Sequence, residues 1–140
     1  MHPKVYVNRT LNLKKIKYVG FDMDHTLVRY HSENFEKLAH TTMIEKLINN
    51  RNYPKDIKKI KFDYTRAIRG LVIDKKNGNL LKLSRWGAIR GSYHGTKKID
   101  FEKQKEIYRS TYIDLRDPHY SSIDTSFSIA YAVLYAQLVD

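Results

Sequence analysis

The feature that most constrains the fold is a short apolar run that ends in two aspartates, VGFDMDHTLV over residues 19–28. Residues 16–22 favour a β-strand, and the uninterrupted apolar stretch from Tyr18 to Phe21 is typical of a strand buried on both faces. Strands of that kind belong to parallel sheets, so the sequence predicts an α/β fold. Each parallel neighbour needs a crossover connection of about a dozen or more residues, and the sequence offers one convincing candidate for a parallel strand. We therefore expect the chain to be the N-terminal piece of a longer protein.

The two aspartates that end this run predict a ligand site. Asp22 and Asp24 stand two positions apart, so in extended backbone their side chains point the same way. At the carboxyl end of a parallel strand they would face the cleft in which open α/β sheets bind ligands. Two carboxylates about 4 Å apart repel by roughly 4 kcal/mol at an effective dielectric of about 20, and a magnesium ion, which prefers oxygen ligands, would offset that repulsion. The ion would also neutralise an approaching phosphate.

With a cation bound, the two acids can divide the work of phosphate transfer. One carboxylate would attack phosphorus and form an aspartyl-phosphate, and the other would protonate the leaving alkoxide and later take a proton from water. The plain alternative is that Asp22 opens a polar turn and Asp24 caps the next element. The D-x-D-x-T frame, completed by Thr26 and followed by Leu27 and Val28, favours the catalytic interpretation.

The segment after the aspartates predicts an amphipathic helix over residues 34–50. Ser32 is expected to cap its start and Asn49–Asn50 to end it, and His40 is expected on its exposed surface. The expected apolar face consists of Phe35, Leu38, Met43, Ile44, Leu47 and Ile48.

The second half of the chain predicts a hairpin and two helices. Residues 70–83 predict a β-hairpin in which Asn77-Gly78 supplies the positive φ of a tight turn, and residues 101–110 predict a short helix. The closing segment is apolar nearly all round, which predicts a deeply buried helix. This helix ends at Asp140, whose charge opposes the helix dipole. The candidates for its N-terminal cap are Asp124, Thr125 and Ser126.

Composition excludes several classes of protein. Cysteine is absent, which excludes disulfides and cysteine–metal sites. No apolar run reaches about 18 residues and the N-terminus lacks a signal-peptide core, so we expect no membrane span and a cytoplasmic location. The net charge of +11 favours acidic partners such as nucleotides, phosphate esters, nucleic acid or an anionic membrane. Because the lysines are scattered, a solvated surface is favoured over a dedicated nucleic-acid face.

Several strings of the sequence resemble a known family. FDMDHTL, residues 21–27, resembles the first motif of the haloacid dehalogenase superfamily of phosphotransferases. One branch of that superfamily, the cytosolic purine 5′-nucleotidases that act on IMP and GMP, is similar over nearly the whole chain. The strings that carry this second likeness are VYVNRTLNLKKIKYVGFDMDHTLVRY, RGLVIDKKNGNLLKL, HG at residues 94–95 and the closing AQLVD.

The resemblance implies a fold and a set of roles. The fold would be a Rossmann-like core, a parallel sheet flanked by helices, with the hairpin as an insertion and a helical cap starting over about residues 101–140. Asp22 would be the phosphate-accepting nucleophile and a magnesium ligand, and Asp24 would be the general acid and base, with its backbone carbonyl also on the metal. Phe127 matches an aromatic residue near the purine base. His94 and Arg116 lie near segments that resemble the family's nucleotide effector site.

The sequence thus predicts a magnesium-dependent phosphohydrolase that removes the 5′-phosphate of purine nucleoside monophosphates. The family's phosphate-binding Ser/Thr, its lysine and its second acidic pair have no clear counterpart in these residues, so the chain alone is expected to be a weak catalyst or none. Two alternatives remain open, a non-catalytic basic module that binds nucleic acid and a degenerate superfamily member used for protein contacts. Neither a membrane nor nucleic acid is the expected partner, and self-association into a homo-oligomer is left open.

Overall fold

The chain divides into two compact units, Met1–Tyr30 and His31–Asp140. The structure, a computed structural model, describes residues 12–109 and 111–140. None of the helices in these described ranges is both long enough and apolar enough to cross a membrane.

The prediction of a strand over residues 16–22, in the first unit, is wrong. No residue between Ile16 and Asp22 belongs to a strand, and the apolar side chains there are exposed, Tyr18 at 91%. A strand is stable when a neighbour satisfies its backbone N–H and C=O groups, and the described strands pair only with one another. Within residues 12–30, the described part of this unit, the regular element is the 3₁₀ turn η1, Leu13–Lys15, whose start is capped by the side chain of Asn12.

The second unit contains one antiparallel sheet of order β4-β3-β2-β1-β5. The predicted hairpin is confirmed, since β1 and β2 pair around a turn in which Gly78 has a φ of 70°. Every pairing in this sheet is antiparallel, so the described residues form a mixed helix-and-sheet architecture in which the parallel, Rossmann-like core is not shown. The strands are β1 (Leu71–Asp74), β2 (Asn79–Leu83), β3 (Ile89–His94), β4 (Lys97–Lys98) and β5 (Tyr120–Ser122).

The helices match the predicted segments with shifted ends. The first begins at Ser32 rather than being capped by it, and it continues past the expected Asn49–Asn50 to Asn52, which ends it in the left-handed conformation. None of the expected side chains caps the last helix: the turn η3 intervenes, and Ser128 precedes the helix without a side-chain cap bond. The helical elements are α1 (Ser32–Arg51), η2 (Lys55–Lys59), α2 (Phe101–Tyr108), η3 (Ser126–Ser128) and α3 (Ile129–Val139).

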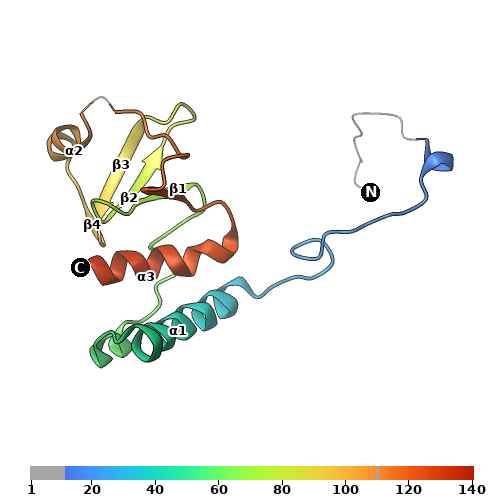
Figure 1. The fold of residues 1–140 in the computed structure, drawn as a ribbon, viewed down its shortest axis with the longest axis horizontal. Helices are drawn as coiled ribbons and strands as arrows, with labels where there is room; N and C mark the ends of the chain where they lie inside the picture. Colours follow the sequence, from blue (N-terminus) through green and yellow to red (C-terminus); the bar gives the residue numbers. More distant parts are fainter. Residues whose placement is uncertain (1–11, 110) are drawn as a thin grey trace, which may run out of the picture. The chain divides into compact units, whose positions relative to one another are not determined.

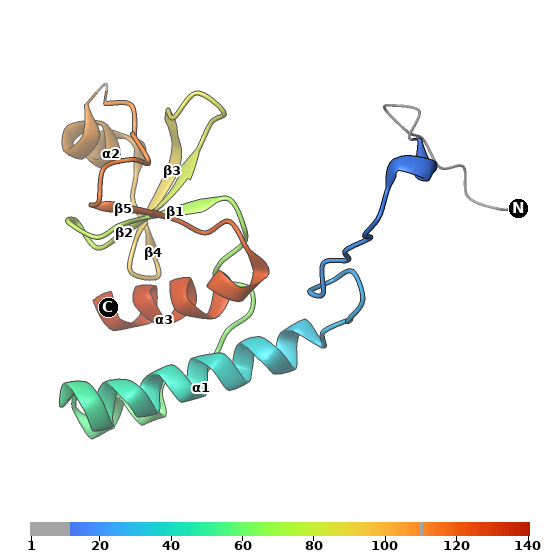
Figure 2. The same ribbon diagram turned by 45° about the vertical axis from the view of Figure 1, so that its right-hand side comes forward.

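The sheet has a different cover on each face. Ile73 and Leu80 point toward α3 and pack with Ala132, Val133 and Ala136. Their neighbours along the strands point the opposite way, because side chains alternate across a sheet. That second face packs against Tyr108 of α2. Figures 1 and 2 show the resulting layers, with α2 on one side of the sheet, α3 on the other, and α1 beyond α3.

Polar side chains connect α1 to α3. The side chains of Glu36, His40 and Ile44 are buried at a spacing of four residues, which places them on one face of α1. Glu36 accepts a hydrogen bond from the backbone N–H of Ala130 at 2.8 Å, and thus supplies the cap that α3 does not find in its own sequence. The expected surface position of His40 is wrong, since this ring is buried and bonds to Gln137 at 2.8 Å.

The acidic end of α3 has partners of its own. The carboxylate of Asp140 accepts hydrogen bonds from both the backbone N–H and the hydroxyl of Thr96, which hold the pKa of Asp140 below its usual range. Gly95 allows this approach: its φ is 55°, and a Cβ there would overlap a carboxylate oxygen of Asp140. The unfavourable interaction with the helix dipole is therefore offset locally.

Candidate functional site

The D-x-D-x-T segment folds into a closed turn. The backbone N–H groups of Leu27 and Val28 both donate to the carbonyl of Met23, each at 3.0 Å. His25 has a φ of 59°, in the left-handed region, and the chain loops round so that Asp24 and Val28 form an isolated parallel β-bridge. Histidine is one of the side chains that adopts this region more readily than most. The turn therefore brings the residues after the motif back toward it.

This turn joins Asp24 to Tyr30. The Tyr30 hydroxyl donates to Oδ1 of Asp24 at 2.5 Å, and the ring of His25 lies against that of Tyr30 with centroids 5.3 Å apart. The hydrogen bond to the Asp24 carboxylate raises the pKa of Tyr30 above its ordinary value. Asp24 is partly buried, whereas Asp22 is exposed. The sequence interpretation did not find Tyr30, because only the conformation of the intervening turn brings it to the acid.

The turn carries oxygen donors of the kind that Mg²⁺ prefers, and the magnesium site expected here stays a prediction. Mg²⁺ usually keeps several waters and is held by one or two carboxylates together with substrate phosphates. Asp22 would supply a carboxylate, and Asp24 its backbone carbonyl. Within residues 12–109 and 111–140 no group of three or more acidic, histidine or cysteine side chains comes together, so no all-protein cage for a metal is present there.

The other three predicted site residues stand on separate elements of the second unit. Phe127, in η3, packs edge-on against Phe35 of α1, with ring centroids 5.2 Å apart. The exposed Arg116 is bound by Asp114 at 2.7 Å, and this pairing lowers the pKa of Asp114 to about 2. His94 lies in β3. Their roles toward a base or an effector stay predictions.

His94 is held by a buried hydrogen-bond network that sequence reasoning missed. Its Nδ1 lies 2.9 Å from Oδ1 of Asn79, whose Nδ2 donates to the Tyr108 hydroxyl at 2.7 Å. That hydroxyl donates in turn to Oδ2 of Asp74 at 2.7 Å. Because the Asn79 oxygen is an acceptor, Nδ1 of His94 carries the proton. The sequence signal for this network was the pair of polar residues, Asp74 and Asn79, that flank the hairpin turn. Their partner Tyr108 lies far away along the chain, so the sequence did not connect it to them.

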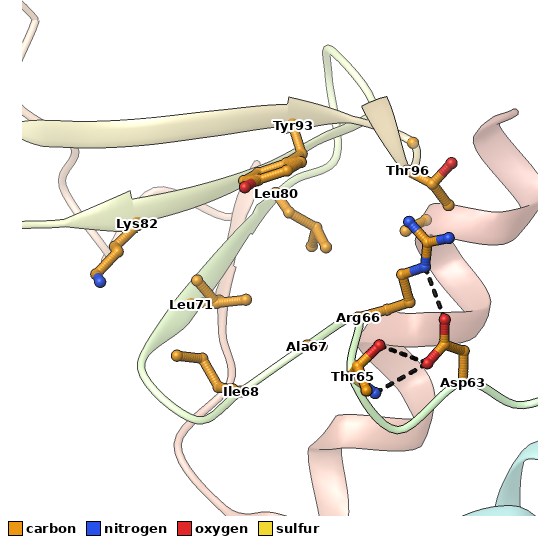
Figure 3. A pocket seen from close by; sticks show the side chains of 12 residues that line it. Asp63, Thr65, Arg66, Ala67, Ile68, Leu71, Leu80, Lys82, Tyr93 and Thr96 are labelled. Carbon is orange, nitrogen blue, oxygen red and sulfur yellow. Dashed lines mark hydrogen bonds and ion pairs between the residues drawn. The ribbon is translucent and has the colours of Figure 1, made fainter. Parts of the chain in front are cut away.

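A pocket of about 460 Å³ opens between the sheet and the segment before β1. Figure 3 shows its apolar floor, with the Tyr93 ring beside Leu80, and its polar end, where Asp63 binds the side chains of Thr65 and Arg66. The five predicted site residues do not line this pocket. The pocket and the D-x-D turn therefore consist of different residues.

Comparison with known sequences decides the family. Residues 5–140 match the 5′ nucleotidase family. The chain belongs to this family. Among its relatives are a 5′-nucleotidase domain-containing protein of Dictyostelium discoideum, 36% identical over 76% of this chain and 18% of that protein, and the human 5′-nucleotidase domain-containing protein 1, 31% identical over 87% of this chain and 29% of that protein. The bovine protein of the same name is 29% identical over 87% of this chain.

The 5′ nucleotidase match covers both units and includes the D-x-D turn, Asp22 and Asp24 among its residues. The chain spans less than a third of the length of the relatives it matches.

Proposed function

We propose that this chain carries the nucleophile and the general acid of a 5′-nucleotidase, a magnesium-dependent phosphohydrolase of the haloacid dehalogenase type that acts on purine nucleoside monophosphates such as IMP and GMP. The observation that carries the proposal is the family match over residues 5–140, which contains the D-x-D-x-T turn. The net charge of +11 supports an anionic substrate.

The reaction has two half-reactions. A carboxylate oxygen of Asp22 attacks phosphorus, the bond from phosphorus to the 5′-oxygen breaks, and the protonated Asp24 gives its proton to that oxygen. Water then attacks phosphorus, Asp24 takes one of its protons, and the Asp22 carboxylate is released with inorganic phosphate. The magnesium ion, when bound, supplies charge neutralisation of the phosphoryl oxygens.

The nucleophile is tested by phosphate release from IMP and GMP by the full-length protein with magnesium. We expect the D22N variant to release phosphate at the background rate, because an amide does not displace the alkoxide. D56N, which changes the same charge on an exposed aspartate of η2, is the matched control and should keep the wild-type rate. Equal rates for D22N and the wild type would rule out the proposed nucleophile.

The same assay addresses base preference and the need for the rest of the protein. We expect slower release from CMP and UMP than from IMP and GMP. We also expect the isolated 140-residue chain to fall far below the full-length protein, because it would offer the magnesium ion one carboxylate side chain alone, that of Asp22. Full activity of the isolated chain would contradict this second expectation.

A further inference from the structure

The closed turn around Asp24 fixes one of its two carboxylate oxygens. The contact between Tyr30 and Asp24 is made within one segment of the chain, between residues six positions apart. It therefore does not depend on how helices or strands pack. Its hydroxyl proton points to Oδ1 of Asp24, at 2.5 Å. A proton carried by Asp24 then resides on Oδ2, because Oδ1 already accepts the phenolic hydrogen.

The turn also limits how Tyr30 itself can move. The centroids of the His25 and Tyr30 rings lie 5.3 Å apart, and the two hydrogen bonds to the Met23 carbonyl close the loop from Met23 to Val28 that carries His25. The carboxyl group is therefore presented with a defined orientation rather than rotating freely about χ2.

We propose that Tyr30 is a positioning residue for the general acid: by holding Oδ1 of Asp24, its hydroxyl directs the proton on Oδ2 toward the leaving 5′-oxygen. This inference rests on the proposed function, because it needs Asp24 to act as the acid. In this role Tyr30 acts through Asp24, and no direct contact with the substrate is assigned to it. Its contribution is to orientation, which is a recognised part of catalytic rate enhancement.

This role makes a specific claim about leaving groups. An alkoxide such as the 5′-oxygen of a nucleoside leaves poorly unless it is protonated, so its departure depends on a well-placed acid. A p-nitrophenolate is a stable anion and leaves without a proton. A loss of acid positioning therefore slows the cleavage of nucleotides and spares the cleavage of p-nitrophenyl phosphate, whereas a general loss of structure slows both.

The experiment compares kcat/KM of the full-length protein for IMP and for p-nitrophenyl phosphate. This parameter covers the steps through the first irreversible one, here phosphoryl transfer to Asp22, and so leaves out the later hydrolysis of the intermediate. We expect Y30F to lower kcat/KM for IMP by about tenfold, a part of the 10²–10⁴-fold that general acid catalysis contributes, and to leave the value for p-nitrophenyl phosphate within about twofold. Y18F is the matched control, since Tyr18 is a tyrosine of the same unit that is 91% exposed; it should change neither value.

Each other outcome has a definite meaning. Equal losses for the two substrates in Y30F would assign Tyr30 a structural role and overturn the inference, as would an unchanged rate with IMP. If the wild type released no phosphate from IMP, or if D22N released it as fast as the wild type, the proposed function itself would fall. In that case the leaving-group comparison would not be reached, so the two failures are distinguishable. Circular dichroism of Y30F checks that the fold is retained.

Discussion

At the scale of single residues, the chemistry of this chain depends on one backbone conformation. The D-x-D-x-T string identified Asp22 and Asp24 as acids of interest, and a reader of the sequence can find them because the string is contiguous. The partner of Asp24 was not predictable in the same way. Tyr30 reaches Asp24 because His25 adopts a φ of 59°. No sequence pattern predicts that the histidine at this position adopts the left-handed conformation.

The contact between Tyr30 and Asp24 has a signature that needs no substrate. A phenol that donates to a carboxylate gives up its proton less readily, so the pKa of Tyr30 lies above its ordinary value. In a carbon-13 NMR titration of the tyrosine ring carbons, we expect D24A to lower the pKa of Tyr30 toward its ordinary value of about 10. D22A removes the same charge two positions earlier without removing the hydrogen bond, and should have a much smaller effect. An unchanged titration of Tyr30 in D24A would show that the hydrogen bond is absent in solution.

At the scale of elements, the helices were predicted from periodicity but their contacts were not. The apolar spacing of residues 34–50 located α1, yet its most buried positions are Glu36, His40 and Ile44, two of which are polar. Leu38, expected on the buried face, is exposed. The reason is that α3 begins without a cap from its own sequence, so an acceptor from α1 at the start of α3 contributes more than another apolar side chain would.

Glu36 should therefore matter both for stability and for its pH dependence. Removing the acceptor in E36A leaves the Ala130 N–H buried without a partner, and we expect a loss of about 1–3 kcal/mol in the free energy of unfolding. E36Q keeps an acceptor oxygen and should lose less. Chemical denaturation at neutral pH measures the difference, and equal stability of E36A and the wild type would contradict the capping role.

The pH dependence of the same site follows from burial, which raises the pKa of Glu36 in the folded chain. Its stabilising contribution is fully present below the unfolded pKa of about 4.3 and is lost as the pH rises through the folded pKa. Because E36Q does not titrate at this position, we expect the stability of the wild type relative to E36Q to fall as the pH rises from 4 toward neutrality. A constant difference between the two proteins over this range would show that Glu36 has an ordinary pKa.

At the scale of the whole molecule, the class of the fold was only partly readable from the sequence. The hairpin was predicted because Gly78 and the flanking apolar runs are local signals. The parallel sheet was inferred from one apolar run, 16–22, and a sheet depends on neighbours that a single run cannot specify. The chain spans less than a third of the length of its relatives, and among its described residues no strand pairs in parallel with residues 16–22.

The sheet itself depends on a buried network as well as on apolar packing. Tyr108 links α2 to β1 and β2 through Asp74 and Asn79. We expect Y108F to lower the free energy of unfolding by about 1–3 kcal/mol, because both partners lose a hydrogen bond in a buried place. Y112F removes the hydroxyl of an exposed tyrosine nearby in sequence and should have little effect. Thermal unfolding of the two variants makes the comparison, and similar midpoints would contradict the role of the network.

The two faces of the sheet pack against different helices, α3 and α2, and therefore tolerate different substitutions. On the α3 side, where the side chains at positions 73, 80 and 133 make apolar contacts, a randomised library should return many combinations of aliphatic residues at these positions. On the α2 side, the side chains at positions 74, 79 and 108 are joined by hydrogen bonds. A substitution that changes a donor or an acceptor at one of these positions therefore needs a matching change at another. In folded variants from such a library, the residues on the α3 side would therefore vary independently of one another, whereas those on the α2 side would change together.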